Sequence, residues 1–163
     1  MIRKKTEKKE YTTKNVIETQ KMGEKLAAKI LETKPQNMAF IIGLQGELGS
    51  GKTIFLQGFA KGLGIKEKVL SPTFVIMKKF RIKHPASNIQ YLIHIDCYRL
   101  KGPKDLLDLG FKKIISDPKN IVVIEWADKI KKILPKNSFI LQFYFVSQKR
   151  RRITSFFNLP SEK

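Results

Sequence analysis

Residues 46–53 read GELGSGKT, a complete match to the phosphate-binding pattern G-x-x-x-x-G-K-[ST]. Glycines let the backbone fold tightly enough for its N–H groups to surround a polyphosphate, and the positive end of a following helix adds to the attraction. In this pattern the lysine contacts the outer phosphates, and the final hydroxyl binds Mg²⁺. The motif therefore predicts a nucleotide-binding loop made of Gly46, Glu47, Leu48, Gly49, Ser50, Gly51, Lys52 and Thr53.

The segments on either side of the loop fit the same prediction. Residues 38–44 form a short apolar run that is typical of a buried strand. Residues 54–61 carry apolar side chains at helical spacing, and Gly62 is a stop signal for that helix. An ordinary glycine-rich turn is the alternative, but strand, loop and helix together favour the first unit of an α/β nucleotide-binding fold.

The size and composition suit a single domain. A chain of 163 residues can bury a sizeable core, and it has no run of about 18 apolar residues that would span a membrane. Its one cysteine, Cys97, cannot form an internal disulfide, which agrees with a reducing, cytoplasmic setting. We expect a basic, disordered tail over residues 1–11, a P-loop nucleotide-binding domain over 12–159, and a short tail over 160–163, with no membrane association.

The chain is strongly basic, with a net charge of +19 from 33 basic and 14 acidic residues. Such a charge attracts anionic partners, nucleic acid above all. However, only six of the basic residues are arginine, and the lysines are spread through nearly every segment, a pattern that the codon bias of an AT-rich genome also produces. The basic cluster at 149–152 is more suggestive, because arginine suits phosphate recognition.

The remaining segments alternate between helix and strand patterns. A helix capped by Thr12 and Thr13 is predicted from near Asn15, with an apolar face of Val16, Met22, Leu26, Ala27 and Ile30. After the phosphate loop and its helix, the patterns predict a hairpin over 74–82 and 91–96, and then short helices over 103–107 and after Gly110. They further predict a strand over 121–124, a helix over 129–134, and strands over 139–146 and 153–157. This order predicts one P-loop NTPase-like α/β domain with a central mixed sheet flanked by helices.

Two acidic residues end apolar strands, Asp96 and Glu125. Ligands of such sheets bind at the carboxyl ends of strands, and phosphoryl transfer needs Mg²⁺ and a group that positions the nucleophile. These acids are therefore candidates for both roles, although either could be a helix cap. Thr73 follows Ser71-Pro72 and could position Mg²⁺ or water, or lie in an ordinary turn. His94 is interpreted as a strand residue with a satisfied ring.

Together these segments resemble the TsaE (YjeE) family, the ATPases of bacterial threonylcarbamoyladenosine synthesis. The resemblance extends over about residues 13–155. Besides the loop, it rests on SPTF at 71–74, HIDCYRL at 94–100, IEW at 124–126 and MGEKLA at 22–27. Many families share the phosphate loop, whereas this combination is far more specific.

The resemblance implies a Mg²⁺-dependent ATPase with low intrinsic activity, acting with homologues of TsaB and TsaD. TsaD and TsaB transfer threonylcarbamoyl onto the tRNA adenosine beside the anticodon, and TsaE supports their repeated turnover. The chain would then meet tRNA through the complex or by direct contact, and the sequence leaves this choice open. By the same resemblance, the loop including Lys52 would bind the phosphates of ATP, and Thr53 with Glu125 would hold Mg²⁺. Asp96 would act in hydrolysis, Thr73 in a switch-like segment, and Trp126 near the nucleotide.

One segment departs from the family pattern. Family members commonly have a Gly-Arg pair before the last strand, whereas residues 148–152 read QKRRR here. Which of Arg150, Arg151 and Arg152, if any, approaches the nucleotide stays open.

Two other functions are compatible with parts of the sequence. A small-molecule kinase of the phosphate-loop class would normally carry a lid with clamping arginines, and no insertion of that length is visible. A basic RNA-binding module would interleave aromatic and basic residues, but the aromatics of 139–145 alternate like a strand core.

Overall fold

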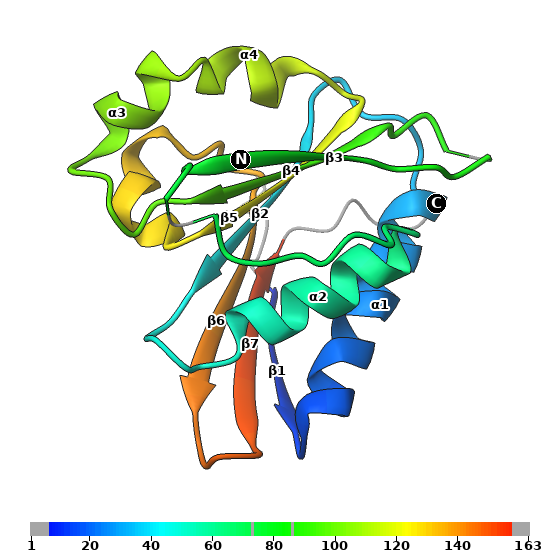
Figure 1. Ribbon diagram of the computed structural model, residues 1–163, viewed down its shortest axis with the longest axis vertical. Coiled ribbons are helices and arrows are strands. Elements are labelled where there is room, and N and C mark those ends of the chain that lie inside the picture. The colour runs from blue at the N-terminus through cyan, green and yellow to red at the C-terminus, as the bar shows by residue number, and fades with distance from the viewer. Residues whose placement is uncertain (1–6, 73, 86, 158–163) are drawn as a thin grey trace.

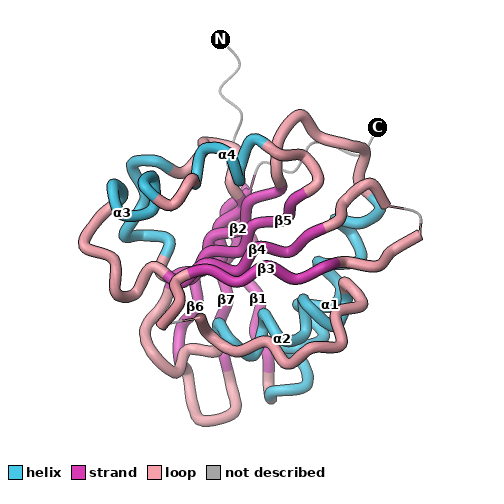
Figure 2. The backbone as a smooth tube through the Cα atoms, turned by 45° about the horizontal axis from the view of Figure 1, so that its top comes forward, coloured by secondary structure: helices cyan, strands magenta, loops and turns pink. Residues whose placement is uncertain are grey.

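A computed structural model of the chain describes residues 7–72, 74–85 and 87–157. These residues form a seven-stranded sheet with helices on both faces (Figure 1, Figure 2). The strand order is β1-β7-β6-β2-β5-β4-β3. The prediction of one α/β domain with a central mixed sheet is confirmed. No helix within the described ranges is long and apolar enough to cross a membrane.

Four parallel strands make the centre of the sheet, in the order β6 (Phe139–Phe145), β2 (Phe40–Gln45), β5 (Asn120–Glu125) and β4 (Tyr91–Asp96). Every residue of β5 is buried, and so are the four central residues of β2. Helices cover both faces of this region, which explains the unbroken apolar runs of the sequence. The carboxyl ends of β2, β4 and β5 therefore meet at one edge of the sheet.

Both margins of the sheet are antiparallel. Strand β3 (Met77–Arg81) pairs with β4, and β7 (Arg151–Phe157) pairs with β6. The predicted hairpin strand over 74–82 begins only at Met77, because residues 74–76 form a turn, and the Ile76 N–H donates to the Pro72 carbonyl at 2.7 Å.

Strand β1 (Glu7–Thr13) corrects the predicted tail. We expected residues 1–11 to be disordered, but residues 7–11 belong to a strand that pairs with β7 along its whole length. The described side chains of residues 8–12 are exposed, and most of them are charged. This composition is typical of an edge strand that is protected from pairing with other chains, and it lacks the alternating apolar residues that usually indicate a strand. The predicted tail over 160–163 lies outside the described residues.

Helices α1 (Val16–Glu32) and α2 (Lys52–Gly62) cover one face of the sheet. The cap of α1 is Asn15, whose side chain accepts a hydrogen bond from the Glu18 N–H, and not Thr12 or Thr13 as predicted. The two threonines are part of β1, where their backbone pairs with β7. Val16, predicted on the apolar face, is 45% exposed.

The α1 and α2 backbones touch at glycines. A Cβ on Gly58 would lie 2.0 Å from the Gln20 carbonyl oxygen, and one on Gly23 would lie 2.3 Å from that of Phe55. This close contact holds the first turn of α2, and with it the phosphate loop, against the rest of the domain.

The opposite face carries α3 (Pro103–Asp108), α4 (Phe111–Ser116) and the 3₁₀ helix η1 (Ala127–Ile133). Alternation along β5 supplies both cores. Ile121 and Val123 pack toward α1 and α2, whereas Val122 and Ile124 pack toward η1 and α3. By the same alternation, Glu125 points to the face that carries α2.

Candidate nucleotide-binding site

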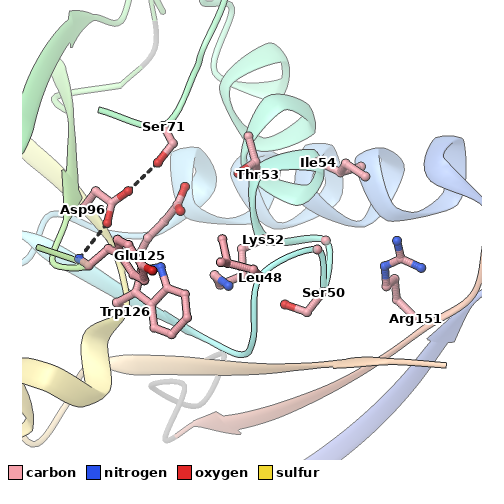
Figure 3. Close-up of a pocket in the computed structure, with 13 residues that line it drawn as sticks. Leu48, Ser50, Lys52, Thr53, Ile54, Ser71, Asp96, Glu125, Trp126 and Arg151 are labelled. Carbon is pink, nitrogen blue, oxygen red and sulfur yellow. Dashed lines mark hydrogen bonds between the residues drawn. The ribbon is translucent and has the colours of Figure 1, made fainter. Parts of the chain in front are cut away.

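A pocket of about 390 Å³ lies at the edge where β2, β4 and β5 end (Figure 3). Most of the residues that the sequence predicted for the site line it together. Its lining consists of Leu48, Gly49, Ser50, Gly51, Lys52, Thr53, Ile54, Ser71, Asp96, Tyr98, Glu125, Trp126 and Arg151. Thr73, also predicted, lies outside the described residues.

Three glycines of the loop, Gly46, Gly49 and Gly51, have positive φ angles. Gly46 has a φ of 138°, and a Cβ there would lie 2.6 Å from the Phe143 carbonyl oxygen. Gly51 is the N-cap of α2 with a φ of 104°, a left-handed conformation that side chains disfavour. The turn at Gly51 directs the chain into α2, so the free N–H groups of that helix's first turn face the pocket.

Lys52 is a buried cation inside the loop. Its side-chain ammonium donates hydrogen bonds to the carbonyls of Gly46, at 2.5 Å, and Glu47, at 2.9 Å. Gly46 and Glu47 thus support Lys52 and do not line the pocket themselves. Burial lowers the pKa of Lys52, and the negative charges of Glu125 and Asp96 oppose this effect.

Two hydrogen-bond donors among the described residues hold Asp96 at the end of β4. The Ser71 hydroxyl donates to one carboxylate oxygen, and the backbone N–H of Tyr98 donates to the other at 2.8 Å. Each oxygen of a carboxylate can accept a further bond. The predicted segment 71–73 therefore reaches the pocket through Ser71, a residue the sequence analysis included only as part of that segment.

Glu125 and His94 form a buried pair. They are 3% and 0% exposed, and His94 Nε2 lies 3.1 Å from Glu125 Oε1. Strand register explains the contact, because His94 pairs with Val123 and so lies diagonally across from Glu125. The prediction of a satisfied ring is only half right, since Nδ1 is buried without a partner among the described residues.

Trp126 follows Glu125 directly and lines the pocket. Its backbone is left-handed, with a φ of 57°. The Lys52 ammonium lies 4.5 Å from the centre of its ring, and the ring of Tyr98 packs against it with the centroids 5.0 Å apart. Trp126 is the only tryptophan of the chain, so its fluorescence reports on this pocket alone.

Arg151 is the one arginine of the 150–152 cluster that lines the pocket. It is 8% exposed, and Nη1 donates to the backbone carbonyls of Ser147, Gln148 and Arg150 in the turn before β7. Figure 3 shows it on the side of the loop away from Asp96 and Glu125. The sequence alone left open which arginine approaches the nucleotide. The alternation of side chains along β7 could have identified Arg151, because Arg151 lies on the same face of this strand as the buried Ile153.

The donor atoms around the pocket fit Mg²⁺. No cluster of three or more His, Cys, Asp or Glu side chains suited to a metal exists in the described part of the chain. Magnesium does not need such a cluster, because proteins usually hold it through one or two carboxylates together with substrate phosphates. The Thr53 hydroxyl and the Glu125 carboxylate supply hard oxygen donors on two sides of the same pocket.

Comparison with known proteins gives one consistent family. The family model for "Threonylcarbamoyl adenosine biosynthesis protein TsaE" matches residues 13–153. The tRNA threonylcarbamoyladenosine biosynthesis protein TsaE of Treponema pallidum is 32% identical over 70% of this chain and 79% of its own. That of Bacillus subtilis is 34% identical over 70% of this chain and 67% of its own. The crystal structure of Bacillus subtilis YdiB has a TM-score of 0.69 and 29% identity, covering 94% of this chain and 88% of that chain.

Proposed function

This chain belongs to the TsaE family of tRNA threonylcarbamoyladenosine biosynthesis proteins, and on that premise we propose that it is the ATP-hydrolysing member of its pathway. The observation that carries the proposal is the pocket itself. Lys52, Asp96 and Glu125 come from three different elements and line one cavity together with the phosphate loop.

Each of these residues has a role that its surroundings support. The N–H groups of residues 49–53 and the Lys52 ammonium bind the phosphates of ATP. Thr53 and Glu125 would hold Mg²⁺, which would supply positive charge to offset the negative charge between the phosphates. Asp96, fixed by Ser71 and the Tyr98 N–H, accepts a hydrogen bond from the attacking water and orients it. The ring of Trp126 covers the Lys52 ammonium on one side.

We further propose that the chain acts with TsaB and TsaD homologues in the cytoplasm and meets tRNA within their complex. Exposed apolar side chains beside the pocket support a protein partner there. Leu48, in the loop, is 75% exposed, and Phe74 and Val75, just beyond Ser71, are 85% and 67% exposed. These side chains offer apolar surface that a protein partner would cover.

The direct test of the ATPase site is the Glu125→Ala variant. We expect ATP to change the fluorescence of Trp126 in both proteins, whereas Mg²⁺-dependent hydrolysis is lost only in the variant. A variant that hydrolyses ATP at the wild-type rate would contradict the proposed role. A variant that no longer unfolds cooperatively on heating would show that Glu125 is structural.

A further inference from the structure

We propose that His94 is a positioning residue for Glu125, holding one carboxylate oxygen so that the other is directed to Mg²⁺ in the pocket. The inference rests on the proposed role of Glu125 as a Mg²⁺ ligand. It adds a residue that does not line the pocket and that neither the phosphate loop nor the acidic strand ends predicted.

The contact is built into the centre of the sheet. His94 lies on β4 and Glu125 at the end of β5, and both side chains are almost completely buried. Nε2 of His94 is 3.1 Å from Oε1 of Glu125, and no other hydrogen bond to the Glu125 side chain is made by the described residues. Because neither strand end can move without breaking the parallel pairing, the ring fixes the direction of the carboxylate.

The hydrogen bonding of the His94 imidazole indicates that its role is the contact with Glu125. A bond to an ionised carboxylate requires a proton on Nε2. Nδ1 then lies buried without a partner among the described residues, which costs stability. An apolar side chain would pack at this place without that cost. We therefore attribute the imidazole to its one bond with Glu125, the kind of outer contact that orients a metal-binding carboxylate.

Three substitutions at His94 separate positioning from packing. Gln places its amide nitrogen near the position of Nε2, Asn places it near Nδ1, and Leu has no donor. The chain is first loaded with ADP, and Mg²⁺ is then titrated while Trp126 fluorescence is recorded, so that no hydrolysis is needed. ADP binding in EDTA checks that the loop of each His94 variant is intact.

We expect His94→Gln to keep the half-saturating Mg²⁺ concentration within about threefold of wild type. His94→Asn and His94→Leu should raise it about 10- to 100-fold, the usual effect of removing a contact outside the metal's own ligands. Thermal unfolding of each variant accompanies the titration. If the Leu variant does not fold, the Gln and Asn pair decides, because both leave an amide in the same buried place.

The Glu125→Gln variant separates a failure of this inference from a failure of the proposed function. If Glu125→Gln raises the Mg²⁺ requirement but His94→Asn does not, His94 has no positioning role. If Glu125→Gln leaves the requirement unchanged, Glu125 is not a Mg²⁺ ligand and both proposals fall. Equal weakening by Gln and Asn, or loss of cooperative unfolding in both, would show that His94 acts through packing and would overturn the inference.

Discussion

At the scale of single residues, the site places a buried lysine opposite two buried carboxylates. Lys52, Asp96 and Glu125 could be predicted, because a motif or the end of an apolar strand marks each of them. The hydrogen bonds that hold the two carboxylates in place could not be predicted from the sequence. The bond from His94 to Glu125 depends on the register between β4 and β5, and the bond from Ser71 to Asp96 joins residues 25 positions apart.

Replacing Lys52 by Ala should weaken ATP binding by about 10- to 100-fold, because each hydrogen bond to a charged group contributes about 1.5–3 kcal/mol. Trp126 fluorescence measures the affinity. Lys61→Ala is the matched control, since Lys61 lies on the same helix with its side chain 76% exposed and paired to Glu24. Equal affinity of the Lys52 variant and the control would contradict the site.

The pH dependence of binding should also reflect Lys52. Burial lowers its pKa below 10.5, so the folded chain holds this proton less tightly than the unfolded chain. The cost of burying the charge is therefore present below the lowered pKa and disappears as the pH rises toward 10.5. Phosphate binding needs the charge, so affinity for ADP should fall at a lower pH than the ordinary lysine value predicts. Constant affinity from about pH 7 up to 10.5 would contradict this expectation.

At the scale of elements, the strands of the sheet centre and α2 were predicted well because burial on both sides gives long apolar runs. Two errors have different causes: the apolar residues 74–76 form a turn before β3, and the polar residues 7–11 belong to a strand. Strand β1 is an exposed edge held by its backbone pairing with β7, and side chains carry little sign of such pairing. The packing of α1 on α2 through Gly23 and Gly58 was also hidden, since a glycine inside a helix usually indicates a weak helix.

The Gly58→Ala variant tests that helix contact. Alanine favours a helix by up to about 1 kcal/mol over glycine, but its Cβ would overlap the Gln20 carbonyl, and overpacking costs about 1–3 kcal/mol or more. The cost of the overlap with the Gln20 backbone should exceed the gain in helix propensity, so the melting temperature should fall by about 3–10 °C. Gly102→Ala is the control, because no atom lies within 4 Å of a Cβ there and its φ is 177°. If Gly58→Ala is as stable as Gly102→Ala, α1 and α2 can move apart without a loss of stability.

At the scale of the whole molecule, the sheet and its two helical layers bring the ends of β2, β4 and β5 to one edge. The α/β class followed from the order of elements. The strand order could not be predicted from the order of elements, because strands that are neighbours in the chain, such as β5 and β6, are separated in the sheet by β2. The net charge of +19 belongs to this scale as well, and its role in RNA contact is open to measurement.

Binding of tRNA to the isolated chain should depend steeply on salt if this charge contacts phosphates. Each phosphate contact adds about 0.7–0.9 to the slope of log affinity against log salt concentration. We expect a slope corresponding to several contacts, measured by fluorescence anisotropy of labelled tRNA over a salt series. A flat response would make the positive charge incidental to RNA.

The central claim is that the pocket hydrolyses ATP under the control of partners. The most direct measurement is the rate of Mg²⁺-dependent ATP hydrolysis by the chain alone, then with its TsaB and TsaD homologues and tRNA, with the Lys52→Ala variant as background. We predict slow hydrolysis by the isolated chain and a large stimulation by the complete set of partners. A rate that the partners leave unchanged, and that rises only with a small-molecule acceptor, would contradict the claim and indicate a kinase.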